Sequence, residues 1–193
     1  MYIKSLGCGL LLLLAGQAQA AWQFVPEDSQ ATARITDITD QGSQVHTHRL
    51  SNLEGSISDS GELVIPITLK QLDVVQNLGT LPPWLSDIGK KRLATVATQV
   101  DTAWLNSLNI GQSAQHTIAL SQEDQRYTQT DHVALTITRT DANRFHVQTT
   151  SPVPIDTQAV MQEPNAQTVV SLLGYRKLGD TVPLSLDATL VQQ

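Results

Sequence analysis

The stretch ELVIPITLKQLD, residues 62–73, places an apolar side chain at every second position. Leu63, Ile65, Ile67 and Leu69 alternate with Val64, Pro66, Thr68 and Lys70. Because successive side chains on a strand point to opposite faces of a sheet, this alternation predicts a strand with one buried apolar face. That face has to be covered by other parts of the chain.

The same period of two returns along the rest of the sequence and predicts further strands. Apolar residues alternate within 96–100, 114–120, 133–137, 145–149 and 182–190. Short polar segments at 59–61 and 140–143 separate neighbouring strands and predict hairpin turns. Seven or eight such strands give an all-β, antiparallel sheet. It covers its apolar face either by closing into a barrel or by stacking as a sandwich.

Two segments interrupt this alternation. Residues 75–94 contain Pro82 and Pro83, which cannot donate ladder hydrogen bonds, so we expect a long connection with a helical turn. Residues 164–174 carry apolar residues at helical spacing, with a proline before them and Gly174 at the end, which predicts one short helix. Long irregular inserts in an all-β chain are often functional loops.

Residues 1–20 have the pattern of a secretory signal peptide. Lys4 precedes an apolar run, and Ala18-Gln19-Ala20 forms a typical cleavage site. We therefore expect a periplasmic or secreted protein that begins at Ala21 and forms one domain, 21–193. The apolar run is too short to span a bilayer and no second run of about 20 apolar residues follows, so no membrane-spanning segment is expected.

The composition of residues 21–193 argues against several classes of function. Without residues 1–20 the chain has 11 basic and 18 acidic residues, a net charge of −7 with neutral histidines, which argues against nucleic acid as a partner. The one cysteine, Cys8, lies in the removed segment. Thiol catalysis and thiolate metal sites are therefore excluded from the expected mature protein.

Several segments together carry a resemblance to a known family. They are Trp22, HRLSNLEGSISDSGELVIPITLKQLDV at 48–74, LNIGQSAQHTIALSQ at 108–122, VALTITRTDANRFHVQTTSPVPID at 133–156 and LGDTVPLSLDATLV at 178–191. In this order they resemble the YceI-like family of secreted bacterial proteins. The resemblance implies an eight-stranded antiparallel, lipocalin-like β-barrel, here with one or two short helices. It also implies an apolar pore that holds a polyisoprenoid lipid or a quinone.

The chain departs from this family after Leu72-Asp73. Many members continue there with a stretch that contains Arg and His near the pore mouth, whereas this chain has neither before Lys90. A family-type grip on a charged head group is therefore missing or replaced. Candidates for contacts at the mouth are His46, His48, Trp84, Lys90, Lys91 and Arg92. The three basic residues have the alternative role of a solvated surface.

The inward apolar side chains of the predicted strands are the candidate lipid contacts. They are Leu50, Leu63, Ile65, Ile67, Leu69, Val96, Val100, His116, Ile118, Leu120, Val133, Leu135, Ile137, Phe145, Val147, Leu184 and Leu186. Few are aromatic, so an eight-stranded barrel built from them has room inside. Burying about fifteen carbons contributes roughly 10 kcal/mol, and after an association cost of at least ~4 kcal/mol this predicts binding around the ten-micromolar range. The alternative is a dry core made by the same side chains.

The histidines are the other candidates for chemistry. His46 and His48 are two positions apart on a predicted strand, so they share a face with Leu50. They could bind a metal only with a third ligand such as His116, and we predict no metal site. A polar contact to a lipid head group and a structural role remain alternatives. His132 and His146 alternate with the apolar residues of their hairpin and are expected to face water.

Evidence for catalysis is sparse in the sequence. GQSAQ at 111–115 lacks the second glycine of a nucleophile elbow and opens a strand rather than a helix. The sequence therefore predicts no catalytic residue and no cofactor other than a bound lipid or quinone. The favoured function is a carrier of an amphiphilic lipid. An enzyme that uses the same cavity and a protein-binding module with a packed core are the alternatives, and a homodimer is left open.

Overall fold

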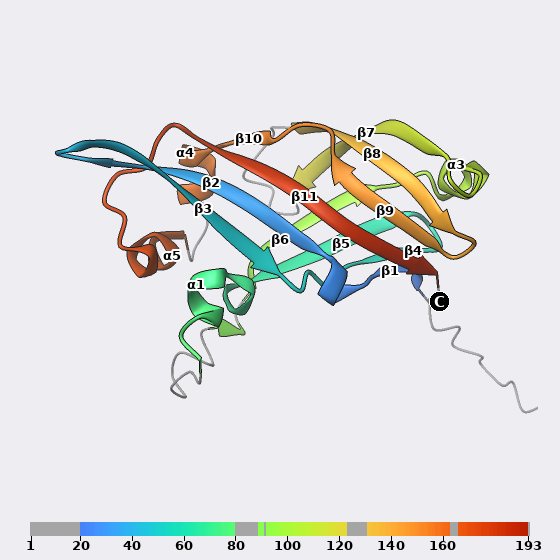
Figure 1. The fold of residues 1–193 in the computed structure, drawn as a ribbon, viewed down its shortest axis with the longest axis horizontal. Coiled ribbons are helices and arrows are strands. Elements are labelled where there is room, and N and C mark those ends of the chain that lie inside the picture. The colour runs from blue at the N-terminus through green and yellow to red at the C-terminus, as the bar shows by residue number, and fades with distance from the viewer. Residues whose placement is uncertain (1–19, 80–88, 91, 123–130, 163–165, 193) are drawn as a thin grey trace, which may run out of the picture.

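The fold is a curled antiparallel sheet with short helices at its two ends (Figure 1). The computed structural model describes residues 20–79, 89, 90, 92–122, 131–162 and 166–192. The strands are β1 Ala20–Phe24, β2 Gln30–Thr39, β3 Gly42–Ser51, β4 Ser56–Ser58, β5 Glu62–Thr68, β6 Arg92–Gln99, β7 Ser113–Gln122, β8 Asp131–Asp141, β9 Arg144–Thr149, β10 Val153–Asp156 and β11 Thr181–Gln192. The helices are α1 Asp73–Gln76, α3 Thr102–Ser107, α4 Thr157–Met161 and α5 Ala166–Leu173, with 3-10 turns η1 Pro26–Asp28 and η2 Leu69–Gln71.

Strand β1 closes the sheet into a ring. It pairs antiparallel with β4 on one edge and with β11 on the other, where Phe24 lies opposite Leu190. The ring then runs from β4 through β5, β6, β7, β8 and β9 to β11. These are the eight antiparallel strands of the predicted lipocalin-like barrel, so the fold class is confirmed. The sheet has 11 strands in all.

The additional strands lie beside the ring rather than within it. The β2–β3 hairpin extends the sheet from β11, where Leu184 pairs with Ala33, and β10 pairs with the start of β11. The tip of the hairpin projects from one end of the molecule (Figure 1). Strands as short as β4 and β10 hold too few residues to show a period of two, which is why the sequence predicts fewer strands than the structure contains.

The register of β5 with β6 shows how the alternation positions the core. Ile65 lies opposite Val96, and directly opposed residues of an antiparallel pair project from the same face. Ile65 and Leu63 are buried, whereas Glu62 on the other face is exposed. The apolar face of the opening stretch therefore looks into the barrel, where it meets the inward faces of β7, β8, β9 and β11.

The two ends of the barrel are filled differently. At one end Trp22 and Phe145 pack edge to face with ring centroids 4.8 Å apart, and α3 adds the buried Leu105. At the other end a second apolar cluster of Leu69, Leu72 and Val75 joins η2 to α1. We call the first the plugged end and the second the helical end, where α1 and α5 lie (Figure 1).

The structure confirms one predicted helix and corrects the limits of the irregular segment. Helix α5 falls within 164–174 and ends before Gly174, whose φ of 77° is left-handed. The segment 75–94 contains the end of α1, but β6 already begins at Arg92. Residues 80–88 of this segment lie outside the described residues. Helices α3 and α4 were not predicted, because five or six residues show no clear helical period.

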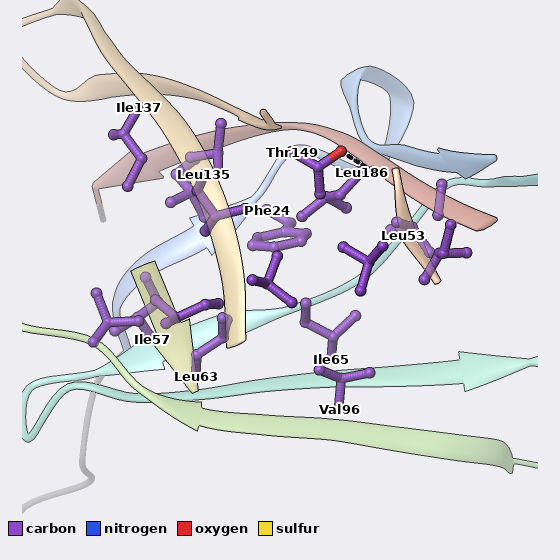
Figure 2. A pocket seen from close by; sticks show the side chains of 18 of the residues that line it. Phe24, Leu53, Ile57, Leu63, Ile65, Val96, Leu135, Ile137, Thr149 and Leu186 are labelled. Atoms are coloured by element: carbon purple, nitrogen blue, oxygen red, sulfur yellow. Dashed lines mark hydrogen bonds between the residues drawn. The ribbon is translucent and has the colours of Figure 1, made fainter. Parts of the chain in front are cut away.

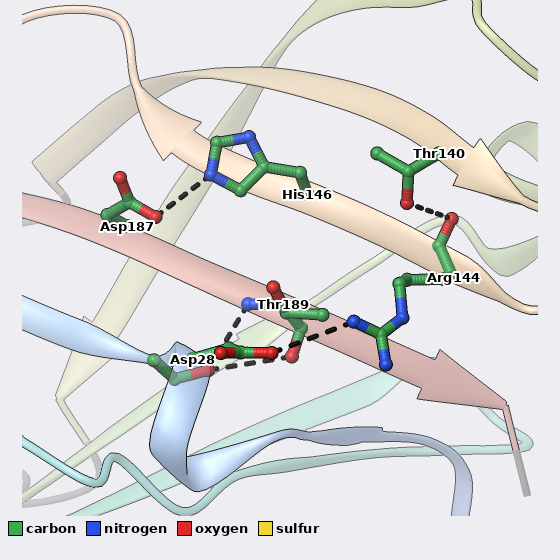
Figure 3. Close-up of polar contacts among 7 residues, drawn as sticks. Asp28, Thr140, Arg144, His146, Asp187 and Thr189 are labelled. Carbon is green, nitrogen blue, oxygen red and sulfur yellow. Dashed lines mark hydrogen bonds and ion pairs between the residues drawn. The ribbon is translucent and has the colours of Figure 1, made fainter.

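No described helix combines the length and apolar composition that crossing a membrane requires. The outer face of the sheet carries polar pairs instead (Figure 3). His146 Nε2 lies 2.9 Å from Asp187 Oδ1, and Arg144 lies 3.6 Å from Asp28. His132 is exposed and His146 is partly exposed, as predicted from their alternation with apolar residues.

The turn at Gly61 leads to a test of the hairpin before β5. Gly61 has φ 87°, and a Cβ there would lie 2.2 Å from the carbonyl oxygen of Val100. Gly111 has a similar φ of 82°, but a Cβ there would meet nothing within 4 Å. We expect Gly111→Ala to cost about 1–2 kcal/mol of unfolding free energy from the left-handed backbone alone. Gly61→Ala should cost a further ~1–3 kcal/mol from overpacking, measured by urea denaturation. Equal losses for the two variants would contradict the clash.

Candidate functional site

The interior of the barrel holds an apolar cavity (Figure 2). Its volume is about 130 Å³. The residues around it come from all eight strands of the ring, from β2, β10 and α3, and from the segment before β4. The cavity therefore runs along the barrel rather than lying between two loops.

Most of the predicted inward side chains border this cavity. They are Leu63, Ile65, Ile67, Val96, Val100, His116, Ile118, Val133, Leu135, Ile137, Val147, Leu184 and Leu186. Figure 2 shows several of them converging from opposite walls. Period-two alternation thus placed these side chains on the inner face. Whether they contact a lipid stays a prediction.

Three predicted lining residues do not border the cavity. Phe145 is inward but fully buried against Trp22 in the plugged end, so it fills space that a ligand would need. Leu69 continues the alternation of β5 in sequence, but the chain has already turned into η2, and Leu69 joins the second apolar cluster. Leu50 packs against both clusters without bordering the cavity. The side chain of Leu120 lies outside the described residues.

The structure adds lining residues that the sequence did not single out. They are Phe24, Ala31, Leu53, Ile57, Leu105, Thr149, Val153, Ile155 and Leu190. Thr149 and Leu190 lie on predicted strands in phase with the inward residues, so the period would have found them. Leu53 lies between strands and Leu105 on a short helix, where no periodic signal exists.

Polar groups are almost absent from the lining. Among the described residues that border the cavity, only His116 and Thr149 have polar side-chain atoms. The Thr149 hydroxyl accepts a hydrogen bond of 3.2 Å from the Leu186 backbone N–H, drawn in Figure 2. The His116 ring stacks on Trp104 of α3, with centroids 4.3 Å apart. The cavity therefore offers apolar contacts and little that would bind water or a polar ligand.

The cavity volume sets the binding energy that the barrel can supply as it stands. An apolar cavity of about 150 Å³ holds a molecule the size of benzene, so a cavity of about 130 Å³ accepts roughly six carbon atoms. Burying them gives roughly 5 kcal/mol, and an association cost of at least ~4 kcal/mol nearly cancels this gain. The fifteen-carbon tail expected from the sequence exceeds this space. Tighter binding needs side chains at the wall or at the helical end to move.

A polar cluster lies at the helical end, beyond the cavity. His48 on β3 is held between Asp73 of α1 and Tyr175, which follows α5. His48 Nδ1 lies 3.2 Å from Asp73 Oδ1, and Nε2 lies 2.6 Å from the Tyr175 hydroxyl. The His46 ring also lies against Tyr175, with centroids 5.1 Å apart. The predicted mouth residues His46 and His48 therefore meet a tyrosine and a carboxylate that sequence reasoning missed.

Asp73 orients this cluster. Burial raises the pKa of Asp73, but the hydrogen bonds from the Arg49 N–H, from His48 and from the Val74 N–H together lower it below 3.8. Asp73 is therefore a carboxylate at neutral pH and can only accept hydrogen bonds. The proton of a neutral His48 ring lies on Nδ1, so Nε2 accepts from the Tyr175 O–H.

The structure describes two of the other four predicted mouth residues. Lys90 and Arg92 are exposed at the start of β6, and Arg92 pairs with Thr68 at the end of β5. Trp84 and Lys91 lie outside the described residues. The proposed third metal ligand, His116, borders the cavity and stacks on Trp104 of the plugged end, apart from the His48 cluster. Within the described part of the chain, no three or more His, Cys, Asp or Glu side chains are arranged to hold a metal.

The cluster leads to a pH prediction. Because the folded-state pKa of Asp73 is lowered, its stabilising contribution is present above about pH 5 and is lost as pH falls through the folded value. Asp73→Asn should cost about 1–2 kcal/mol at pH 7 and flatten the decline of unfolding free energy below about pH 5.

The control for this prediction is Asp187→Asn, which removes an exposed carboxylate–histidine pair from the outer face (Figure 3). Its cost at pH 7 should stay below ~0.5 kcal/mol. Thermal or urea unfolding between pH 3 and pH 7 checks both variants. An acid decline as steep in Asp73→Asn as in the wild type would contradict the assignment.

Comparison with known proteins supports the fold independently. Neither the protein-family models nor the curated protein sequences give a match. Among solved structures, the chain is similar to a polyisoprenoid binding domain from Saccharophagus degradans described as implicated in plant cell wall breakdown. The two share 22% sequence identity with a TM-score of 0.69, over 91% of this chain and 100% of that one. At this identity the likeness shows a shared fold, and the lipocalin-like architecture implied by the YceI-like resemblance is confirmed at that level.

Proposed function

We propose that this protein binds the tail of a long-chain isoprenoid lipid or quinone inside the barrel and carries it outside the cytoplasm. The observation that carries the proposal is the cavity that eight paired strands enclose, whose lining is almost entirely aliphatic. A cavity of this kind selects a ligand by its apolar volume, because the described part of its lining offers almost no hydrogen-bond partner.

The shape of the interior favours a chain over a compact ligand. The cavity extends from Leu105 beside the plugged end to Ile67 and Ile155 towards the helical end. A flexible tail follows such a path better than a rigid ring system does. The structurally similar domain from Saccharophagus degradans is named for polyisoprenoid binding, which supports the same ligand class here.

The proposed location rests on residues 1–20. Their signal-peptide pattern supports export, and a carrier outside the cytoplasm meets the need to move a water-insoluble molecule through an aqueous compartment. Mass spectrometry of the exported protein should find an N-terminus at Ala21. A retained segment 1–20 in that protein would contradict the cleavage and the location together.

Native mass spectrometry of protein expressed through a secretory route tests the ligand. We expect a copurified species of several hundred daltons that organic solvent extracts, with the mass of an isoprenoid lipid or quinone. The empty protein should then bind a prenyl lipid added from solution. A protein that copurifies empty and binds no prenyl lipid added up to its solubility would contradict the proposal and favour the protein-binding alternative.

A pair of neighbouring substitutions on β8 separates the cavity from the outer surface. Leu135 borders the cavity, whereas Ala134 is exposed on the opposite face of the sheet. Leu135→Trp should fill the cavity and weaken binding of a prenyl alcohol at least tenfold, about 1.4 kcal/mol. Ala134→Trp adds the same indole outside and should change the affinity less than twofold. Circular dichroism and melting temperature check that both variants fold, and equal affinities would place the ligand elsewhere.

A further inference from the structure

The inward face of the β2–β3 hairpin continues the wall of the cavity towards the helical end. Ala31 borders the cavity and pairs with Leu50, Ala33 pairs with His48, and Ile35 pairs with His46. Paired residues project from the same face, and successive inward positions lie about 6.7 Å apart along a strand. His48 is therefore the first inward position beyond the apolar wall, where a tail in the cavity would end in its head group.

Of the polar groups at this place, His48 is buried, and Asp73 and Tyr175 are partly exposed. The His48 side chain is 11% exposed. With the proton of the neutral ring on Nδ1, towards Asp73, Nε2 accepts a hydrogen bond from the Tyr175 hydroxyl. A tyrosine hydroxyl that donates a hydrogen bond still has lone pairs on its oxygen, which can accept a hydrogen bond from another group. The Tyr175 oxygen therefore keeps acceptor capacity beside His48 while its O–H bonds to the imidazole.

The charges around Tyr175 are negative. Burial raises the pKa of Tyr175, and the carboxylates of Asp37 and Asp73 raise it further, so the phenol stays protonated. Asp37 Oδ1 is buried and makes no hydrogen bond in the structure, which adds a second acceptor on the same inward face of β2. The nearest basic residues along the chain, Arg176 and Lys177, are exposed. A head group that approaches Tyr175 meets acceptors and negative potential.

We propose that the helical end of the barrel binds an uncharged, hydroxyl-bearing head group, such as that of a prenyl alcohol or a quinol, through a hydrogen bond donated to the Tyr175 oxygen. A diphosphate head brings only acceptors and negative charge, so the two aspartates repel it. An oxidised quinone has only carbonyl acceptors in its head group. It receives no hydrogen bond from Tyr175, because the Tyr175 O–H already donates to His48. The inference rests on the proposed function and adds the chemistry of the head to that of the tail.

Three ligands with the same farnesyl tail test this inference: farnesol, the hydrocarbon farnesene and farnesyl diphosphate. Affinities are measured by displacement of a fluorescent apolar probe. The wild type should bind farnesol roughly tenfold more tightly than farnesene, the value of one good hydrogen bond, and more tightly still than farnesyl diphosphate. In Tyr175→Phe the affinity for farnesol should fall to that for farnesene, while farnesene binding should stay within twofold of the wild type.

The controls separate a head-group contact from a structural role. If Tyr175 only stabilises the helical end, Tyr175→Phe should weaken all three ligands together, which would overturn the inference. His146→Gln removes a histidine–carboxylate pair on the outer face and should leave all three affinities unchanged. Asp37→Asn removes one repelling charge and should raise the affinity for farnesyl diphosphate at least threefold.

The outcomes for the two proposals are distinguishable. Equal binding of farnesol and farnesene by the wild type, or tightest binding of farnesyl diphosphate, would overturn the head-group inference and leave lipid binding intact. Failure of the wild type to bind farnesene and farnesol at all would overturn the proposed function, and the inference with it.

Discussion

Closure of the sheet at β1 is the constraint on which the rest of the structure depends. A few backbone pairs, Trp22 to Phe24 against Leu190 to Gln192, and the pairs with β4, join the two edges of a curled sheet. Closure removes the unpaired edges of the ring and turns one face of every strand towards a common axis. Each inward apolar side chain is then removed from water and buried in the same interior. Trp22, which lies in the closing strand, also packs on Phe145 at the plugged end, so backbone closure and the packing of these two rings support each other.

Within a ring of eight strands, side-chain size decides between a solid core and a hollow. The large rings of Trp22 and Phe145 fill the plugged end, and both are almost fully buried. Towards the other end the inward positions of β2 are Ala31 and Ala33, where larger aliphatic residues would have reached across the axis. The cavity is therefore asymmetric: bulky residues close it at one end, and short helices cover it at the other. That asymmetry would give the proposed lipid a direction, with its tail towards Trp22 and its head towards α1 and α5.

The sequence predicted the faces of the strands because a period of two is a property of the extended backbone. It predicted Ile65 and Leu135 as inward residues without any knowledge of their partners. The period alone, however, gives the face of the sheet on which a side chain lies and not its position along the barrel. Phe145 is inward yet plugs the barrel, and Leu69 is in phase with β5 although the chain has left the strand by then. The polar cluster was beyond sequence reasoning for a different reason. Tyr175 lies 127 positions from His48, and no local pattern reports a contact of that separation.

The cavity and the cluster contribute different parts of recognition. The free energy of apolar burial grows with the length of a lipid tail and depends little on the head group. Aliphatic walls alone would therefore accept any lipid whose tail fits the cavity. Discrimination requires hydrogen-bonding groups whose direction is fixed before the ligand arrives. Asp73 supplies this, because its carboxylate accepts from His48 and from two backbone N–H groups and so sets which nitrogen of His48 is protonated. The imidazole in turn sets the direction of the Tyr175 hydroxyl. The carboxylate of Asp73, at the start of the four-residue helix α1, thus determines which hydrogen bond the helical end of the apolar barrel can offer.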